Sequence, residues 1–77
     1  MKLMVLNLPR DFSEDALAKL FKTQGNIKAV DLVTNDDGTS KGFGFVEMAL
    51  EHEGVAAIEA LHGHQLGKKA IRVKRAD

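Results

Sequence analysis

The sequence predicts an α+β fold whose elements follow the order β-α-β-β-α-β. Two observations carry this prediction. Short stretches of continuous or alternating apolar residues, which are typical of strands, occur four times along the chain. Between the first and second of these stretches, and again between the third and fourth, the apolar residues recur at helical spacing.

The first strand and the first helix follow from an apolar run and a capping residue. Residues 3–8 form a run that Pro9 ends, as in a central strand. Ser13 is a suitable N-cap because acidic residues, which favour the positive end of a helix dipole, follow it. The predicted helix ends near Gly25. Its apolar stripe consists of Leu17, Leu20 and Phe21.

Two further strands are predicted as a hairpin. Apolar and polar residues partly alternate over 27–33, which indicates a half-buried strand. Residues 34–40 are turn formers and include the strong turn pair Asp37-Gly38. Residues 42–48 then resume with aromatic and β-branched side chains, so they form the partner strand.

Helical spacing returns near residue 51 and ends at Gly63, and a loop containing Gly67 precedes a last strand over 71–74. We therefore expect a ferredoxin-like arrangement, with two helices on one face of a four-stranded antiparallel sheet and the other face left to solvent.

Composition limits what this fold can do. Seventy-seven residues suffice for one domain, so we expect 1–77 to form a single unit. The chain has no cysteine for a disulfide or a zinc site. No apolar run approaches the roughly 20 residues that span a bilayer, so neither membrane association nor a signal peptide is expected, and the cytoplasm is the default location. A chain that ends almost with the domain favours a small stand-alone protein.

The formal net charge is zero, which removes the simplest argument for nucleic-acid binding. The charges are nevertheless uneven, because residues 66–77 contain five basic residues and one acidic residue. This basic segment fits a solvated edge and a phosphate-contacting edge equally well.

A motif lies on the third predicted strand. Residues 41–48, KGFGFVEM, match the octamer K/R-G-F/Y-G/A-F-V-x-F/Y at six of its seven specified positions. Residues 3–8, LMVLNL, resemble the companion hexamer on the first strand. The chain thus resembles the RNA-recognition-motif family, which implies the fold above and non-enzymatic binding of single-stranded RNA.

Side-chain alternation predicts the contacts on the third strand. Phe43, Phe45 and Glu47 share the uncovered face if the residues between them face the core. The two rings can stack unpaired bases, and Lys41 can meet a phosphate. Gly42 and Gly44 are expected to keep this surface low enough for nucleotides to lie flat.

The first strand supplies Lys2, Met4 and Leu6 to the same face. Met4 replaces the aromatic residue usual in the hexamer, so we expect modest affinity. Asn7, at the end of this strand, is a further candidate contact. Leu6 makes the face apolar enough that a protein partner or weak self-association remains an alternative to RNA, as does single-stranded DNA.

The last strand is expected at the sheet edge beside the first, with Arg72 and Lys74 facing outward. They could line the binding groove, or they could discourage edge pairing. Asp31 and Glu47 oppose a phosphate on this face but can accept hydrogen bonds from base amino groups.

Other chemistry finds little support. His52, His62 and His64 are expected to be solvated loop residues, because a lone His-x-His lacks further metal ligands. No phosphate-cradling glycine motif occurs, so we expect no cofactor and no metal. An enzyme is not expected.

Overall fold

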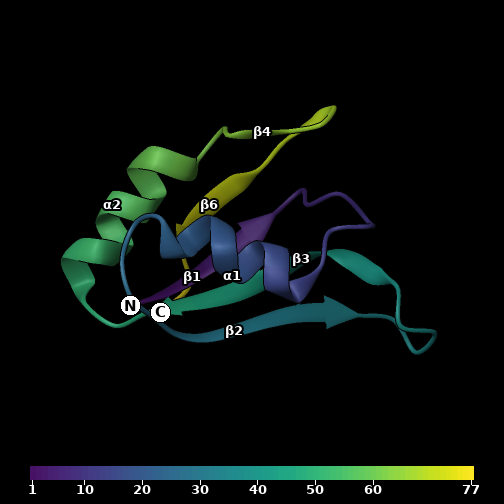
Figure 1. The fold of residues 1–77 in the computed structure, drawn as a ribbon, viewed down its shortest axis with the longest axis horizontal. Helices are drawn as coiled ribbons and strands as arrows, with labels where there is room; N and C mark the ends of the chain where they lie inside the picture. The colour runs from purple at the N-terminus through teal and green to yellow at the C-terminus, as the bar shows by residue number, and fades with distance from the viewer.

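A computed structural model describes residues 1–77 and confirms the predicted fold. A four-stranded antiparallel sheet has the order β2-β3-β1-β6, and both helices lie on one side of it (Figure 1). A separate short hairpin pairs β4 with β5. The elements are β1 (Lys2–Leu6), α1 (Glu14–Lys22), β2 (Ile27–Thr34), β3 (Ser40–Met48), α2 (Glu51–Leu61), β4 (Gln65–Leu66), β5 (Lys69–Ala70) and β6 (Arg72–Arg75).

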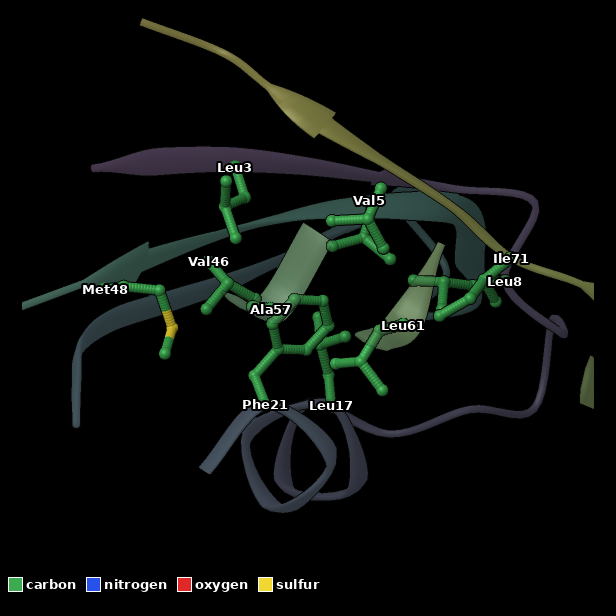
Figure 2. Close-up of a cluster of buried hydrophobic side chains, with 11 residues drawn as sticks. Leu3, Val5, Leu8, Leu17, Phe21, Val46, Met48, Ala57, Leu61 and Ile71 are labelled. Carbon is green, nitrogen blue, oxygen red and sulfur yellow. The ribbon is translucent and has the colours of Figure 1, made fainter. Parts of the chain in front are cut away.

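The core lies between the helices and the covered face of the sheet. Figure 2 shows Leu3, Val46 and Met48 pointing from the strands towards Phe21 and Leu17 of α1. Burial of such side chains, roughly 1.5–3 kcal/mol each, is the main force that holds a domain without disulfides together. The buried apolar residues are Leu3, Val5, Leu8, Leu17, Phe21, Val46, Met48, Ala57, Leu61, Ile71 and Val73.

Helix α1 begins where the sequence predicts and ends earlier. Ser13 is the N-cap, and its Oγ accepts a hydrogen bond from the Ala16 amide at 3.0 Å. The helix ends at Lys22, with Thr23 as C-cap, three residues before the Gly25 that the sequence marks as its stop. Thr23 Oγ1 donates to the Leu20 carbonyl at 2.7 Å, which satisfies a last-turn acceptor without a glycine.

Strand β1 is shorter than predicted because the chain turns at Asn7. The φ angle of Asn7 is 63°, a left-handed conformation that asparagine tolerates and that ends a strand. Its side-chain amide donates to the Ala70 carbonyl at 3.0 Å. Leu8 is therefore buried beyond the end of the strand, and its own amide donates to the Gly42 carbonyl at 2.8 Å.

The segment before the last strand is not the plain loop that the sequence predicts. The strands β4 and β5 pair around Gly67, whose φ of 63° suits a tight turn. Hydrogen bonds from Gly63 to Ile71 and from Ile71 to His64 close the base of this hairpin at 2.7 and 2.9 Å. The last strand consequently runs over 72–75 instead of 71–74.

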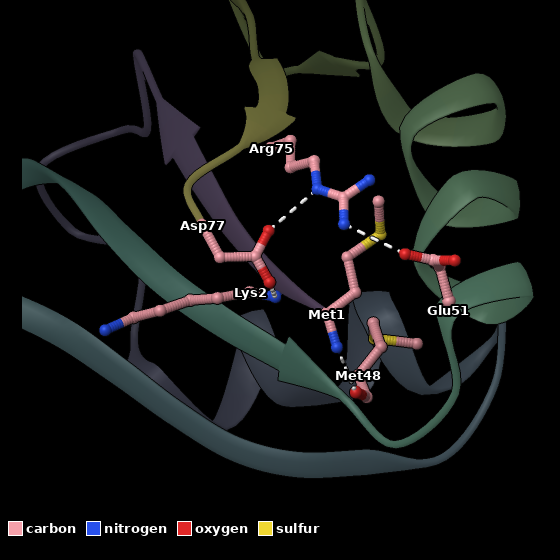
Figure 3. A network of polar contacts seen from close by, with 6 residues as sticks. All are labelled: Met1, Lys2, Met48, Glu51, Arg75 and Asp77. Atoms are coloured by element: carbon pink, nitrogen blue, oxygen red, sulfur yellow. Dashed lines mark hydrogen bonds and ion pairs between the residues drawn. The ribbon is translucent and has the colours of Figure 1, made fainter.

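Polar contacts join the C-terminal end of the chain to β1 and to α2 (Figure 3). Arg75 pairs with Glu51 of α2 at 2.9 Å and with Asp77 at 2.8 Å. Donation from the Lys2 amide, followed by donation from Arg75, holds the pKa of Asp77 below its ordinary value of 3.8. Arg75 therefore lies on the helix side of β6. Neither helix has the length and apolar character needed to cross a membrane.

Candidate nucleic-acid interface

The uncovered face contains a row of four side chains, one from each strand. Lys74 pairs with Met4, Met4 with Phe45, and Phe45 with Asp31. Directly opposed residues of antiparallel strands point to the same face, so we call these four residues the cross-strand row. It runs from a cation on β6, over an apolar centre, to a carboxylate on β2.

The two aromatic rings of β3 are perpendicular to each other. Their centroids lie 6.4 Å apart and the ring planes meet at 82°, the edge-to-face geometry that aromatic pairs favour. One base therefore cannot lie parallel to both rings in this arrangement. A base stacked on Phe45 would meet the edge of Phe43, and a base stacked on Phe43 would meet the edge of Phe45.

Lys2 covers Phe45 in the free protein. Its Nζ lies 5.1 Å from the Phe45 ring centroid, which is a cation–π distance. The exposed Lys2 side chain, and not the core, therefore lies over this face of the Phe45 ring. An exposed cation–π pair is worth about 0.5–1 kcal/mol, whereas a base–aromatic stack is worth about 1–3 kcal/mol. A base can therefore displace Lys2 from the ring.

The apolar part of the face is less exposed than its sequence suggests. Met4, Leu6, Phe43 and Phe45, which we call the apolar tetrad, are all only partly exposed. The large apolar side chains that are most exposed instead belong to α2 and its N-cap, where Leu50 is 48% and Val55 42% accessible. A half-buried tetrad offers limited area to a protein partner.

Basic side chains border the tetrad along one edge. Arg72 pairs with Leu6 and Lys74 with Met4, and both cations are exposed on the edge strand β6, as predicted. Lys41, at the start of β3, is also exposed. The positions of Arg72 and Lys74 fit phosphate contacts along this border, and Lys41 is free for a contact at the start of β3.

Carboxylates occupy the opposite edge. Asp31 flanks Phe45 on β2, and Glu47 lies between Lys2 and Ala29 on neighbouring strands. The Nζ of Lys28 is 3.9 Å from Glu47, an exposed and therefore weak ion pair. Beside these residues is a hollow of about 130 Å³, lined by Lys2, Ala29, Val30, Asp31, Phe45 and Glu47.

Gly44 serves core packing and does not open this face to nucleotides, so that expectation is wrong for Gly44. Gly44 is buried, and a Cβ there would lie 2.7 Å from the Asp31 carbonyl oxygen and 3.3 Å from Leu17 of α1. Gly44 therefore allows α1 to pack on β3. Gly42 has a φ of 87° at an irregularity in the β2–β3 pairing, which a side chain would strain.

The close packing around Gly44 predicts the effect of adding a methyl group there. Gly44→Ala should lower the free energy of unfolding by about 1–3 kcal/mol, because backbone and a core leucine must give way. Urea denaturation followed by far-ultraviolet circular dichroism measures this loss. Weakened RNA binding with unchanged stability would instead favour a role for Gly44 at the nucleotide.

His62 is not a free loop histidine. It is the C-cap of α2, and its Nδ1 accepts from the Val73 amide at 3.0 Å, so it joins the helix end to β6. The structure contains no group of three or more His, Cys, Asp or Glu side chains placed to hold a metal ion.

Strand alternation does not predict where the side chains of Asn7, Lys28 and Arg10 lie, because each is at or beside an irregular part of the backbone. Asn7 faces a backbone carbonyl, as described above, and stays a prediction as a nucleic-acid contact. Lys28 reaches Glu47 because the register shifts by one residue between Ile27 and Ala29. Arg10, a loop residue, lies beside Gly42, since a Cβ added to Gly42 would be 3.4 Å from the Nε of Arg10.

Comparisons with known proteins agree with this geometry. The family model described as the RNA recognition motif matches residues 3–72. The chain is 40% identical over 77 residues to the protein named "Putative RNA-binding protein RbpA" of Nostoc sp., and it spans 76% of that protein. It is 39% identical over 74 residues to the 29 kDa ribonucleoprotein A, chloroplastic, of Nicotiana sylvestris.

Several curated relatives are much longer. The alignment with the Nicotiana sylvestris protein includes 95% of this chain but only 27% of that protein. The alignment with a multiple RNA-binding domain-containing protein of Mycosarcoma maydis includes 91% of this chain and 8% of that protein. Among solved structures, a Sxl-lethal protein/RNA complex aligns with a TM-score of 0.95 at 30% identity, covering 99% of this chain and 46% of that one.

Proposed function

The chain belongs to the RNA-recognition-motif family, and from this we propose that residues 1–77 act as one domain that binds single-stranded RNA on the uncovered face without catalysis. The observation that carries the proposal is the placement of Phe43 and Phe45, the aromatics of the octamer, on the face that no helix covers. The names of RbpA and of the Sxl-lethal complex support RNA as the ligand.

Phe45 is the stacking ring and Phe43 supports it. The face of Phe45 is open once Lys2 moves, whereas Phe43 stands at 82° to it and presents its edge to the same nucleotide. Met4, opposite Phe45, adds a softer apolar contact. With one well-placed ring and no net charge, the affinity of this domain is modest.

A titration of the protein with matched RNA and DNA oligonucleotides, followed by backbone-amide shifts, tests this function. RNA should shift residues 41–47 in a saturable manner. Four basic side chains at this face make no ion pair and are candidates for phosphate contact, namely Lys2, Lys41, Arg72 and Lys74, whereas Lys28 is paired with Glu47. The logarithm of the affinity should therefore fall with the logarithm of salt concentration with a slope no steeper than about 3, since each contact contributes about 0.7.

Other outcomes identify the alternatives. Equal shifts with DNA would make the chain a general single-strand binder. Sedimentation of the free protein addresses association through the apolar tetrad, because dimerisation there would depend on concentration and would be competed by RNA. If neither nucleic acid shifts residues 41–47, the proposed function is wrong.

A further inference from the structure

Along the cross-strand row, the two outer strands of the uncovered face carry opposite charges. Lys74 lies on β6, and Asp31 lies on β2. Met4 and Phe45 separate these two residues. Glu47 lies on β3 beside Asp31, with Lys2 opposite it and Lys28 3.9 Å away. The ends of the cross-strand row are three strand spacings apart, or about 14 Å. A nucleotide can match this arrangement, because its anionic phosphate suits the cation at one end and the hydrogen-bond donors of its base suit the carboxylate at the other.

Electrostatics then orients a bound strand. A phosphate is attracted to Lys74 and repelled by Asp31, so the phosphate of a nucleotide stacked on Phe45 is favoured on the β6 side of the ring. The base of a nucleotide held in this way would project its Watson–Crick edge towards β2. The hollow of about 130 Å³ lies there, large enough for about four waters and thus for the edge of a base.

Carboxylates in that hollow discriminate between base edges. An ionised carboxyl group accepts hydrogen bonds and donates none. Guanine, adenine and cytosine each carry an exocyclic amino donor, whereas uracil has none. The one donor on the Watson–Crick edge of uracil, N3–H, lies between two carbonyl oxygens that a carboxylate repels. Asp31 is exposed and makes no side-chain hydrogen bond or ion pair within the protein, so its oxygens are available.

We propose that the cross-strand row places the base stacked on Phe45 against Asp31 and Glu47, and that this subsite selects bases with an amino group over uracil. The inference rests on the proposed function, because it requires a base on Phe45. Asp31 and Glu47, which do not contact phosphates, then determine which base is bound. Lys28 keeps Glu47 partly neutralised, so Asp31 is the stronger determinant.

Cytosine and uracil form the cleanest pair of probes. The two bases have rings of the same size, so stacking on Phe45 is similar for both. They differ at positions 3 and 4, where cytosine has an acceptor nitrogen and an amino donor and uracil has an N–H donor and a carbonyl acceptor. Fluorescence anisotropy with labelled hexacytidylate and hexauridylate should show about fivefold tighter binding of the cytidine strand, in keeping with a partly exposed hydrogen bond to a charged group.

The variant Asp31→Asn should reduce this ratio to near one, because an amide can donate to uracil as well as accept from cytosine. Asp36→Asn is the matched control: it removes the same charge from an exposed residue of the β2–β3 turn. It should strengthen binding of both strands slightly and leave their ratio unchanged.

The possible failures are distinguishable. If both hexamers bind but with equal affinity, or if Asp31→Asn leaves the ratio unchanged, the base selection is wrong and the proposed function stands. If uridine binds more tightly, the orientation of the strand is also wrong. If neither hexamer binds the wild-type protein, the proposed function fails and base selection fails with it.

Discussion

Replacing Phe21 by alanine should remove most of the stability of this domain. Phe21 is fully buried and is the largest side chain that is completely inaccessible. It joins α1 to the covered face of the sheet (Figure 2). Truncating a buried phenylalanine costs about 3–5 kcal/mol. A domain of this size is stable by only about 4–12 kcal/mol, so the variant should be marginal or unfolded at 37 °C.

The measurement is urea denaturation followed by far-ultraviolet circular dichroism, since the chain has no tryptophan or tyrosine for fluorescence. Phe45→Ala is the matched control, because it makes the same substitution on the partly exposed face. It should shift the unfolding midpoint much less. A loss for Phe45→Ala as large as that for Phe21→Ala would mean that the helices cover the face that carries Phe45.

The sequence predicts the faces of the strands because alternation is a local property of an extended chain. Phe43, Phe45, Met4, Arg72 and Lys74 are all on the face that alternation assigns them. These assignments depend only on residues two positions apart. They remain valid whichever strands pair, as long as no residue is inserted between them.

Predictions fail where the backbone leaves the regular repeat or where the reason for a residue is distant in sequence. Gly44 is small because Leu17 and the β2 backbone approach it, and no local pattern contains that information. Lys28 reaches Glu47 through a shift in register. The sequence predicts that His62 is a loop residue, because the residue that donates a hydrogen bond to it, Val73, lies eleven positions away on β6.

The charge-divided face was only partly predictable for the same reason. Sequence places Asp31 and Lys74 outward, but only the strand order β2-β3-β1-β6 places them at opposite ends of one row. That order depends on long-range pairing, which brings residues 4, 31, 45 and 74 together. The polarity that orients RNA in our proposal is therefore a property of topology.

The double variant Phe43→Ala, Phe45→Ala should weaken RNA binding by about 2–4 kcal/mol, because a base–aromatic stack contributes about 1–3 kcal/mol and the second ring adds an edge contact. Phe45→Ala alone should account for most of the loss. Folding should persist, since neither ring is part of the buried core. Anisotropy titration with a single-stranded RNA, alongside circular dichroism of the same samples, measures both effects.

Two further variants separate stacking from general loss of apolar surface. Phe45→Tyr keeps an aromatic face and should keep nearly all the affinity, whereas Val55→Ala, an exposed change on α2, should alter neither binding nor folding. The salt dependence provides an independent readout. The double variant keeps all four cations near the face, so its affinity should fall at every salt concentration by the same factor. A change in slope would mean that the rings position the phosphate contacts instead of stacking on bases, and stacking on Phe45 would then be the wrong account of how this domain holds RNA.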